Sequence, residues 1–217
     1  MSTLVMPEAK ALAFFLNFHP PQSGIQVFSG FVHALKEARQ LTHRDLYTGQ
    51  KLPNSTGQYG SWLGAVGYFA LLDQIGKCFK PKSVARQNGN AIQQALKHFT
   101  SLNNAEIDAL YALRCAFAHD YSLYNIKSGK PKLTHNFIVG QGATPNVVTL
   151  PQTQWDGNLQ NQAPTVKTTV SLEAFGDLVE LVVHKILSCN LAGDLEILLP
   201  DGSDELVRRY MFMAPSV

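Results

Sequence analysis

Residues 171–189 read SLEAFGDLVELVVHKILSC and contain the strongest helical pattern in the sequence. Apolar side chains recur there every three or four residues, at Leu172, Phe175, Leu178, Val179, Val182, Val183 and Ile186. This spacing predicts an α-helix with one buried stripe. Ser171 stands where an N-cap residue is expected. The core is therefore expected to be built from helices.

Further helices are predicted on the N-terminal side of this stretch and in the tail. Pro7 is a favourable first-turn residue, and Asn103 or Asn104 can cap the helix that follows. With the helix at 171–189, this gives about five or six helices, which predicts a mainly α fold, a helical bundle. The other predicted segments are residues 7–17, 28–41, 58–79, 90–99 and 105–119, and a single turn of helix is expected at 203–212.

The pattern changes between residues 121 and 170. Two β-rich runs, 121–127 and 132–139, flank a glycine turn at 128–131, which is typical of a β-hairpin. Residues 140–165 are rich in turn formers, with a short strand expected at 146–150. Together with another strand at 166–170, this region is expected to be a β-rich insertion before the last long helix of a single domain, 1–217.

The predicted helix at 58–79 carries four glycines, Gly60, Gly64, Gly67 and Gly76. A glycine costs roughly 1 kcal/mol relative to alanine inside a helix, so several suggest that something approaches the backbone closely. Tight packing against another helix is the favoured interpretation. A phosphate-binding loop is disfavoured, because no strand precedes the glycines and their spacing does not match a nucleotide-binding motif.

Composition places the chain among globular proteins, with 45% hydrophobic and 16% charged residues. The low charge content suggests that part of the surface is covered by a second copy of the chain, which predicts a homodimer. The net charge of +2 gives no strongly basic stripe, so a broad grip on duplex DNA is not expected. A local basic cleft remains compatible with this charge.

The cysteines, Cys78, Cys115 and Cys189, are odd in number and widely spaced, which disfavours disulfides and structural zinc and favours a reducing compartment. Histidines are scattered as well, so no metal or cofactor is expected. The N-terminus does not resemble a signal peptide, and the longest apolar run, 62–72, is too short to span a bilayer. A cytoplasmic protein with no membrane partner is expected.

Residues 113–121 read LRCAFAHDY, in which Arg114 and His119 are separated by four residues and Tyr121 follows two residues later. This pattern resembles the HEPN superfamily, whose helical bundles carry an Arg-x4-6-His signature. The added tyrosine is similar to HEPN toxins that are paired with nucleotidyltransferase antitoxins. The resemblance covers the predicted helices from 28 to 119 and from 171 to 189, and the insertion lies outside it.

The resemblance implies metal-independent RNA cleavage by a homodimer in which two motifs face one another across a cleft. Arg114 and His119 are then the catalytic residues, and Tyr121 contacts RNA or receives a nucleotide from a nucleotidyltransferase-type antitoxin. A toxin or defence role follows from the resemblance alone. One departure concerns Cys115, because active members usually carry a polar residue, often asparagine, at this position.

The chemistry of these residue types is consistent with that role. RNA supplies its own nucleophile, the 2′-hydroxyl, so an enzyme needs only proton transfer and charge stabilisation. Histidine exchanges protons near neutral pH, and arginine offers a planar fork of donors to phosphate oxygens. The helix C-terminus and the adjacent Asp120 favour the charged form of His119. On a regular helix Arg114 and His119 lie about 140° apart, so their convergence requires the helix to fray near Ala118.

Structural roles stand beside this hypothesis. Arg114 could pair with Asp73, His119 could cap the helix end, and Tyr121 could pack in the core. Arg39 and His43 lie one turn apart, so they form either a solvated basic edge or a supplementary contact to RNA phosphates. The alternative function is a non-catalytic helical module that dimerises and binds a protein or nucleotide.

Overall fold

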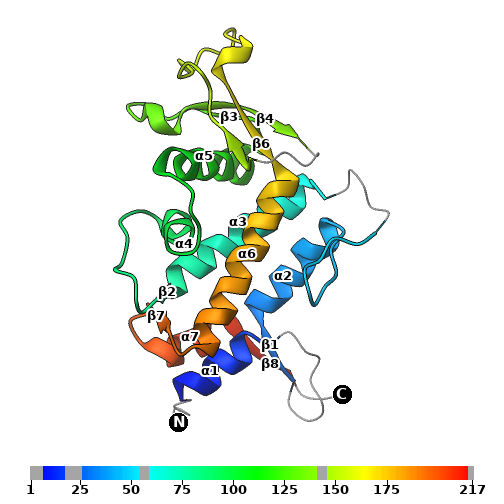
Figure 1. Cartoon of the computed structure of the whole chain (residues 1–217), viewed down its shortest axis with the longest axis vertical. Helices are drawn as coiled ribbons and strands as arrows, with labels where there is room; N and C mark the ends of the chain where they lie inside the picture. Colours follow the sequence, from blue (N-terminus) through cyan, green and yellow to red (C-terminus); the bar gives the residue numbers. More distant parts are fainter. Residues whose placement is uncertain (1–6, 18–25, 54–58, 141–145, 215–217) are drawn as a thin grey trace.

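The computed structural model describes residues 7–17, 26–53, 59–140 and 146–214. These residues contain seven α-helices and eight short strands, arranged as in Figure 1. The helices are α1 (Glu8–Phe15), α2 (Gly30–Leu41), α3 (Trp62–Cys78), α4 (Ala91–Phe99), α5 (Asn104–Asp120), α6 (Leu172–Leu191) and α7 (Gly202–Tyr210). The strands are β1 (Gln26–Ser29), β2 (Phe79–Pro81), β3 (Tyr124–Asn125), β4 (His135–Gly140), β5 (Val148–Thr149), β6 (Lys167–Ser171), β7 (Leu195–Ile197) and β8 (Met211–Ala214).

Helix α6 runs along the molecule from the four-stranded sheet to the end that holds α1 and α7 (Figure 1). Its predicted N-cap is confirmed, because the Ser171 hydroxyl accepts a hydrogen bond from the Ala174 amide at 3.1 Å. The predicted stripe is buried except for the partly exposed Leu178. Helix α5 also begins as predicted, with Asn103 and Glu106 forming a capping box. Local sequence therefore determines where both helices start.

The glycines of α3 are explained by close helix packing, as expected. A Cβ atom built on Gly76 would lie 1.7 Å from the Ala91 carbonyl oxygen at the start of α4. One on Gly64 would lie 2.5 Å from the Thr42 side chain, and one on Gly67 would lie 3.2 Å from Ala38 in α2. Helix α3 therefore approaches its neighbours too closely for larger residues at these positions.

The prediction of a mainly α bundle is wrong, because the chain has an α/β fold. Residues 124–171 contribute a mixed four-stranded sheet with the strand order β3-β4-β6-β5. The expected hairpin is reduced to two paired positions, Tyr124 with Asn136 and Asn125 with His135. Strand β4 instead forms its longest pairing in parallel with β6, from Asn136–Lys167 to Gly140–Ser171. The short strand β5 closes the other edge, antiparallel to β6.

The sheet is not an appendage outside the core. Phe137, Val148 and Val170 from three of its strands belong to the same hydrophobic cluster as the buried residues of the helices. The sheet rests on α5 at one end of the molecule (Figure 1). A segment that the sequence pattern assigned to a surface insertion therefore contributes to the core.

Two small antiparallel ribbons, β1 with β8 and β2 with β7, join distant parts of the chain at the opposite end. The helix predicted from Phe28 starts at Gly30, because the preceding residues pair as β1. The single turn expected in the tail is the longer helix α7. In the described ranges, no helix is at once long and apolar enough to cross a lipid bilayer.

Candidate functional site

Arg114 lies on α5 and faces α3. Its Nη2 atom donates to Oδ2 of Asp73 at 2.9 Å, so the ion pair anticipated between them is present. Both side chains are about one-third exposed. Beside them lies a small cavity of about 100 Å³, lined otherwise by Val66, Phe69, Ala70, Phe117 and Ala118. The guanidinium is thus anchored on one side by a carboxylate and remains open to solvent on the other.

His119 and Asp120 are exposed on the last turn of α5. Within the described chain, the His119 imidazole makes no hydrogen bond or ion pair, so the suggested capping role is not observed. Helix α5 continues to Asp120, so the fraying near Ala118 that convergence of Arg114 and His119 would require does not occur. On this regular helix Arg114 and His119 point about 140° apart. One chain therefore presents the two groups on different faces of α5 rather than in one shared pocket.

Tyr121 ends α5 in the left-handed region, with φ 49° and ψ 44°. The amide of Tyr121 donates to the Phe117 carbonyl at 3.2 Å, as in an αL-type helix end, and the amide of Ser122 donates to the Ala116 carbonyl at 3.1 Å. The Tyr121 ring lies 5.5 Å from Trp62 and 5.9 Å from Phe117, measured between ring centroids, yet 52% of the residue is exposed. Tyr121 is therefore neither a strand residue nor a core residue. It forms the exposed end of an aromatic cluster beside the Arg114 cavity.

Cys115 lies between these groups and is partly exposed. Burial, and secondarily a hydrogen bond with the Cys115 thiol, raises the pKa of Tyr111 one turn earlier. The Tyr111 phenol at this part of the surface therefore stays neutral. Cys78, Cys115 and Cys189 are free thiols.

The predicted basic edge of Arg39 and His43 is wrong. Arg39 is 2% exposed and donates from Nε and Nη2 to the two carboxylate oxygens of Glu180, at 3.0 and 2.7 Å. Its Nη1 atom donates to the carbonyls of Leu46 and Tyr47. His43 is exposed, with a positive φ of 51°, just beyond the end of α2. The Arg39 guanidinium is therefore buried and hydrogen-bonded within the protein, so it is not available to bind RNA.

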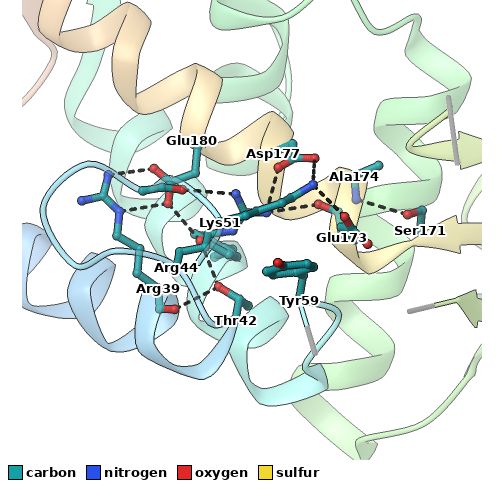
Figure 2. Close-up of polar contacts among 12 residues, drawn as sticks. Arg39, Thr42, Arg44, Lys51, Tyr59, Ser171, Glu173, Ala174, Asp177 and Glu180 are labelled. Carbon is teal, nitrogen blue, oxygen red and sulfur yellow. Dashed lines mark hydrogen bonds and ion pairs between the residues drawn. The ribbon is translucent and has the colours of Figure 1, made fainter. Parts of the chain in front are cut away.

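Glu180 belongs to a buried polar network that the sequence interpretation missed (Figure 2). The Tyr68 hydroxyl donates to Glu180 at 2.9 Å and contacts the Thr42 hydroxyl at 3.3 Å. Burial, reinforced by the negative charge of Glu180, raises the pKa of Tyr68, which keeps this hydroxyl protonated as a donor. The carboxylate is thus satisfied by Arg39 and Tyr68 together.

A second part of the network holds residues 42–53, which we term the strap, against α6 (Figure 2). Arg44 donates to Asp177 at 2.8 Å, and Lys51 bridges Asp177 and Glu173 at 2.8 and 2.7 Å. Glu173, Asp177 and Glu180 are four and three residues apart, so they share one face of α6. This spacing was the signal that could have revealed the network. Because its charges are paired internally, we assign it a structural role.

Metal chemistry receives no support from the side chains. Across the described ranges, no group of three or more His, Cys, Asp or Glu residues is arranged to hold a metal ion. His135 is buried and bonded at both ring nitrogens, to the Thr168 hydroxyl at 2.8 Å and to the Lys132 carbonyl at 2.9 Å. The exposed titratable groups near the end of α5 are therefore the best candidates for chemistry.

No protein-family model matches this sequence, and neither the curated proteins nor the solved structures provide a match. The similarity to HEPN proteins consequently rests on the residues of the 114–121 segment alone.

Proposed function

We propose that the chain binds single-stranded RNA and cleaves it without a metal ion, through Arg114 and His119 at the end of α5. The observation that carries this proposal is that both groups are at least partly exposed near the end of α5, with Arg114 and Phe117 of the aromatic cluster lining a small cavity and His119 exposed one turn further along. The proposal adopts the chemistry that the motif implies and not the mainly α fold. A cytoplasmic location, where RNA is available and thiols stay reduced, is part of the proposal.

Each group has a role suited to its surroundings. The Arg114 guanidinium keeps donors free beyond its bond to Asp73, and these can bind the oxygens of the scissile phosphate. His119 transfers the proton of the attacking 2′-hydroxyl or supplies one to the leaving 5′-oxygen. Tyr121 and Trp62 offer ring faces for stacking of an unpaired base. Asp120 lies beside His119 on the same exposed turn of α5.

Because Arg114 and His119 diverge on one helix, we propose that a second copy completes the site. An apolar groove of about 610 Å³ lies between α2 and α3, and its walls include Leu41 and Leu63, which are 40% and 56% exposed. This groove shares Val66 and Ala70 with the Arg114 cavity. A copy seated there by two-fold symmetry would lie next to Arg114 and could bring its own His119 toward it.

The direct test uses purified protein, 5′-labelled single-stranded RNA and a chelator. We expect wild-type protein to leave a 2′,3′-cyclic phosphate and a 5′-hydroxyl. His119→Ala should reduce the rate by about 100-fold or more. His184→Ala, at an exposed position on α6, is the matched control. An all-deoxy oligonucleotide should remain intact. Equal cleavage by wild type and His119→Ala would remove the catalytic claim.

The dimer has its own test in solution sizing. Leu63→Glu places a charge in the apolar groove and should convert a dimer into a monomer with little cleavage. A wild-type protein that is strictly monomeric at micromolar concentration would contradict the composite site.

A second candidate is the non-catalytic interaction module. The Arg114–Asp73 pair favours it, because a guanidinium already neutralised by a carboxylate can serve a structural role. A dimer that binds RNA or a partner without cleaving would support this function. A toxin role with a nucleotidyltransferase-type antitoxin follows from the resemblance. Its test is whether such an enzyme modifies the exposed Tyr121 and leaves Tyr121→Phe unlabelled.

A further inference from the structure

A loop at residues 127–132, reading KSGKPK, carries three exposed lysines beside the four-stranded sheet. We term it the lysine loop. No ion pair or side-chain hydrogen bond of the Lys127, Lys130 or Lys132 ammonium groups is present among the residues that the structure describes. Two other lysines, Lys51 and Lys80, are paired with carboxylates, and Lys82 and Lys97 donate hydrogen bonds to backbone carbonyls. The lysine loop therefore presents three positive charges that the fold does not neutralise.

The backbone of the lysine loop is held by side chains from outside it. The Thr134 hydroxyl accepts from the Lys127 amide at 3.1 Å, and Gln154 Nε2 donates to the Pro131 carbonyl at 3.0 Å. The buried His135 ring bonds the Lys132 carbonyl, as described above. Gly129 supplies the positive φ of 68° that the turn requires. The lysines thus extend from a fixed support, which lowers the entropic cost of binding.

The position of the lysine loop on α5 links it to the candidate site. A surface hollow of about 370 Å³ is lined by Lys130 and Lys132 together with Asp108 of α5. His119 follows Asp108 by eleven residues, which is close to three turns, so both lie on the same face of α5 within about 20°. The same eleven residues span about 17 Å along the helix axis. The lysine loop and the His119 imidazole therefore lie at opposite ends of one face of α5.

Chain connectivity agrees with this placement. The segment from Tyr121 through β3 to the lysine loop runs back along α5, and both β3 and residues 131–133 pack against that helix. Two acidic side chains, Asp108 and Asp156, border the hollows beside the loop. Asp108 already accepts a hydrogen bond from Gln93. Three lysines against two carboxylates leave a locally positive surface.

Resting on the proposed function, we propose that Lys127, Lys130 and Lys132 form a second phosphate-binding surface for the same single-stranded RNA. Stacked nucleotides advance by about 3.4 Å each, so about five nucleotides separate a phosphate at His119 from one at the lysine loop. Short RNAs reach only the candidate site, whereas longer ones engage both positions. The β-rich segment thus sets the minimal RNA length for tight binding.

The test compares RNAs of four and twelve nucleotides in chelator, with binding measured by competition. The variant is Lys127→Gln/Lys130→Gln/Lys132→Gln, and the charge-matched control is Lys10→Gln/Lys82→Gln/Lys185→Gln at the opposite end of the molecule. We expect the loop variant to lose about tenfold or more in affinity for the longer RNA, and less than about twofold for the shorter one. The slope of log K against log salt should fall by about two.

The outcomes separate the two proposals. If wild type binds and cleaves through His119 while the loop variant matches the control variant at both lengths, the lysine loop is excluded and the proposed function stands. Equal losses for both RNA lengths would also overturn the inference, since the loop would then act locally at His119. A loop variant that loses binding to a polyglutamate peptide but keeps RNA affinity would identify a protein-binding surface instead. Wild-type protein that binds neither RNA overturns both proposals.

Discussion

Two regions of this molecule treat charge in opposite ways. Between the strap and α6, three basic and three acidic side chains pair with one another, and Arg39, Arg44 and Glu180 are nearly fully buried. Along α5, the Arg114 pair is partly exposed, and neither His119 nor the three lysines of the lysine loop form an ion pair with any residue that the structure describes. Buried charges must be satisfied within the protein, whereas exposed unpaired ones can be satisfied by a ligand. The presence of charged residues therefore does not by itself mark a functional site. Exposed charged groups that are not paired within the protein are more informative.

The largest effect should follow from removing one partner of the buried pair. Glu180→Leu leaves Arg39 uncompensated in the interior and should lower the free energy of unfolding by about 3–5 kcal/mol. The double variant Arg39→Met/Glu180→Leu should recover much of this loss, because no charge is then stranded. Urea denaturation measures both. A Glu180→Leu variant as stable as wild type would mean that water reaches Arg39 and replaces Glu180 as its partner.

Two glycines allow packing to be separated from backbone strain. Gly49 (φ 73°) and Gly129 (φ 68°) share the left-handed region, but a Cβ on Gly49 would lie 2.3 Å from Glu180 Oε2, whereas one on Gly129 would have nothing within 4 Å. Gly129→Ala should cost about 1–2 kcal/mol of unfolding free energy through strain alone. Gly49→Ala should cost about 1–3 kcal/mol more, from the clash with the network. Thermal or urea unfolding measures both variants. If they lose the same unfolding free energy, the strap can move away from Glu180 at little cost.

A pH titration should distinguish the buried histidine near the lysine loop from the exposed one on α5. Burial lowers the pKa of His135, against opposing effects of the Lys132 carbonyl and Asp108. The unfolded chain, with a histidine pKa of about 6.5, then binds more protons, so stability should fall as pH drops below about 6.5. His135→Gln should flatten this decline, whereas the effect expected of His119→Ala is on RNA cleavage. The pKa of His98 is also lowered mainly by burial, so His98 accounts for the dependence of stability on pH that remains in His135→Gln. An unchanged slope in His135→Gln would mean that this ring does not contribute.

The smallest effect on stability should come from Arg114. Arg114→Met removes a pair that is about one-third exposed, so the change in unfolding free energy should be below about 1 kcal/mol. RNA affinity should fall clearly in the same variant. If the variant instead lost several kcal/mol of unfolding free energy and bound RNA as wild type does, Arg114 would have a structural role like that of the paired charges between the strap and α6.

Sequence reasoning worked where local chemistry decides the outcome. The stripe and cap of α6, the capping box of α5 and the glycine contacts of α3 depend on neighbours within a few residues or on backbone proximity. The Arg114–Asp73 pair followed from an acidic residue in an apolar stretch. These features needed no knowledge of distant strand pairing.

The failures arose where distant segments meet. Strand β6 pairs in parallel with β4 rather than completing a separate hairpin, and short strands leave too little periodicity to reveal this. Arg39 looked solvent-facing because its partner, Glu180, lies on the far helix α6. Helix α5 remained regular to Asp120, since the left-handed Tyr121 and its aromatic contacts fix the helix end.

The ribbon of β1 and β8 has a consequence for synthesis on the ribosome. Gln26 pairs with Ala214, so the intervening 187 residues must be synthesised before that ribbon can close. Helices α3 and α4 pack against near neighbours and can assemble early, whereas this end of the fold depends on a contact of very high contact order. The nascent chain therefore holds an unpaired strand edge until residues 211–214 have emerged, a period in which chaperones would protect it.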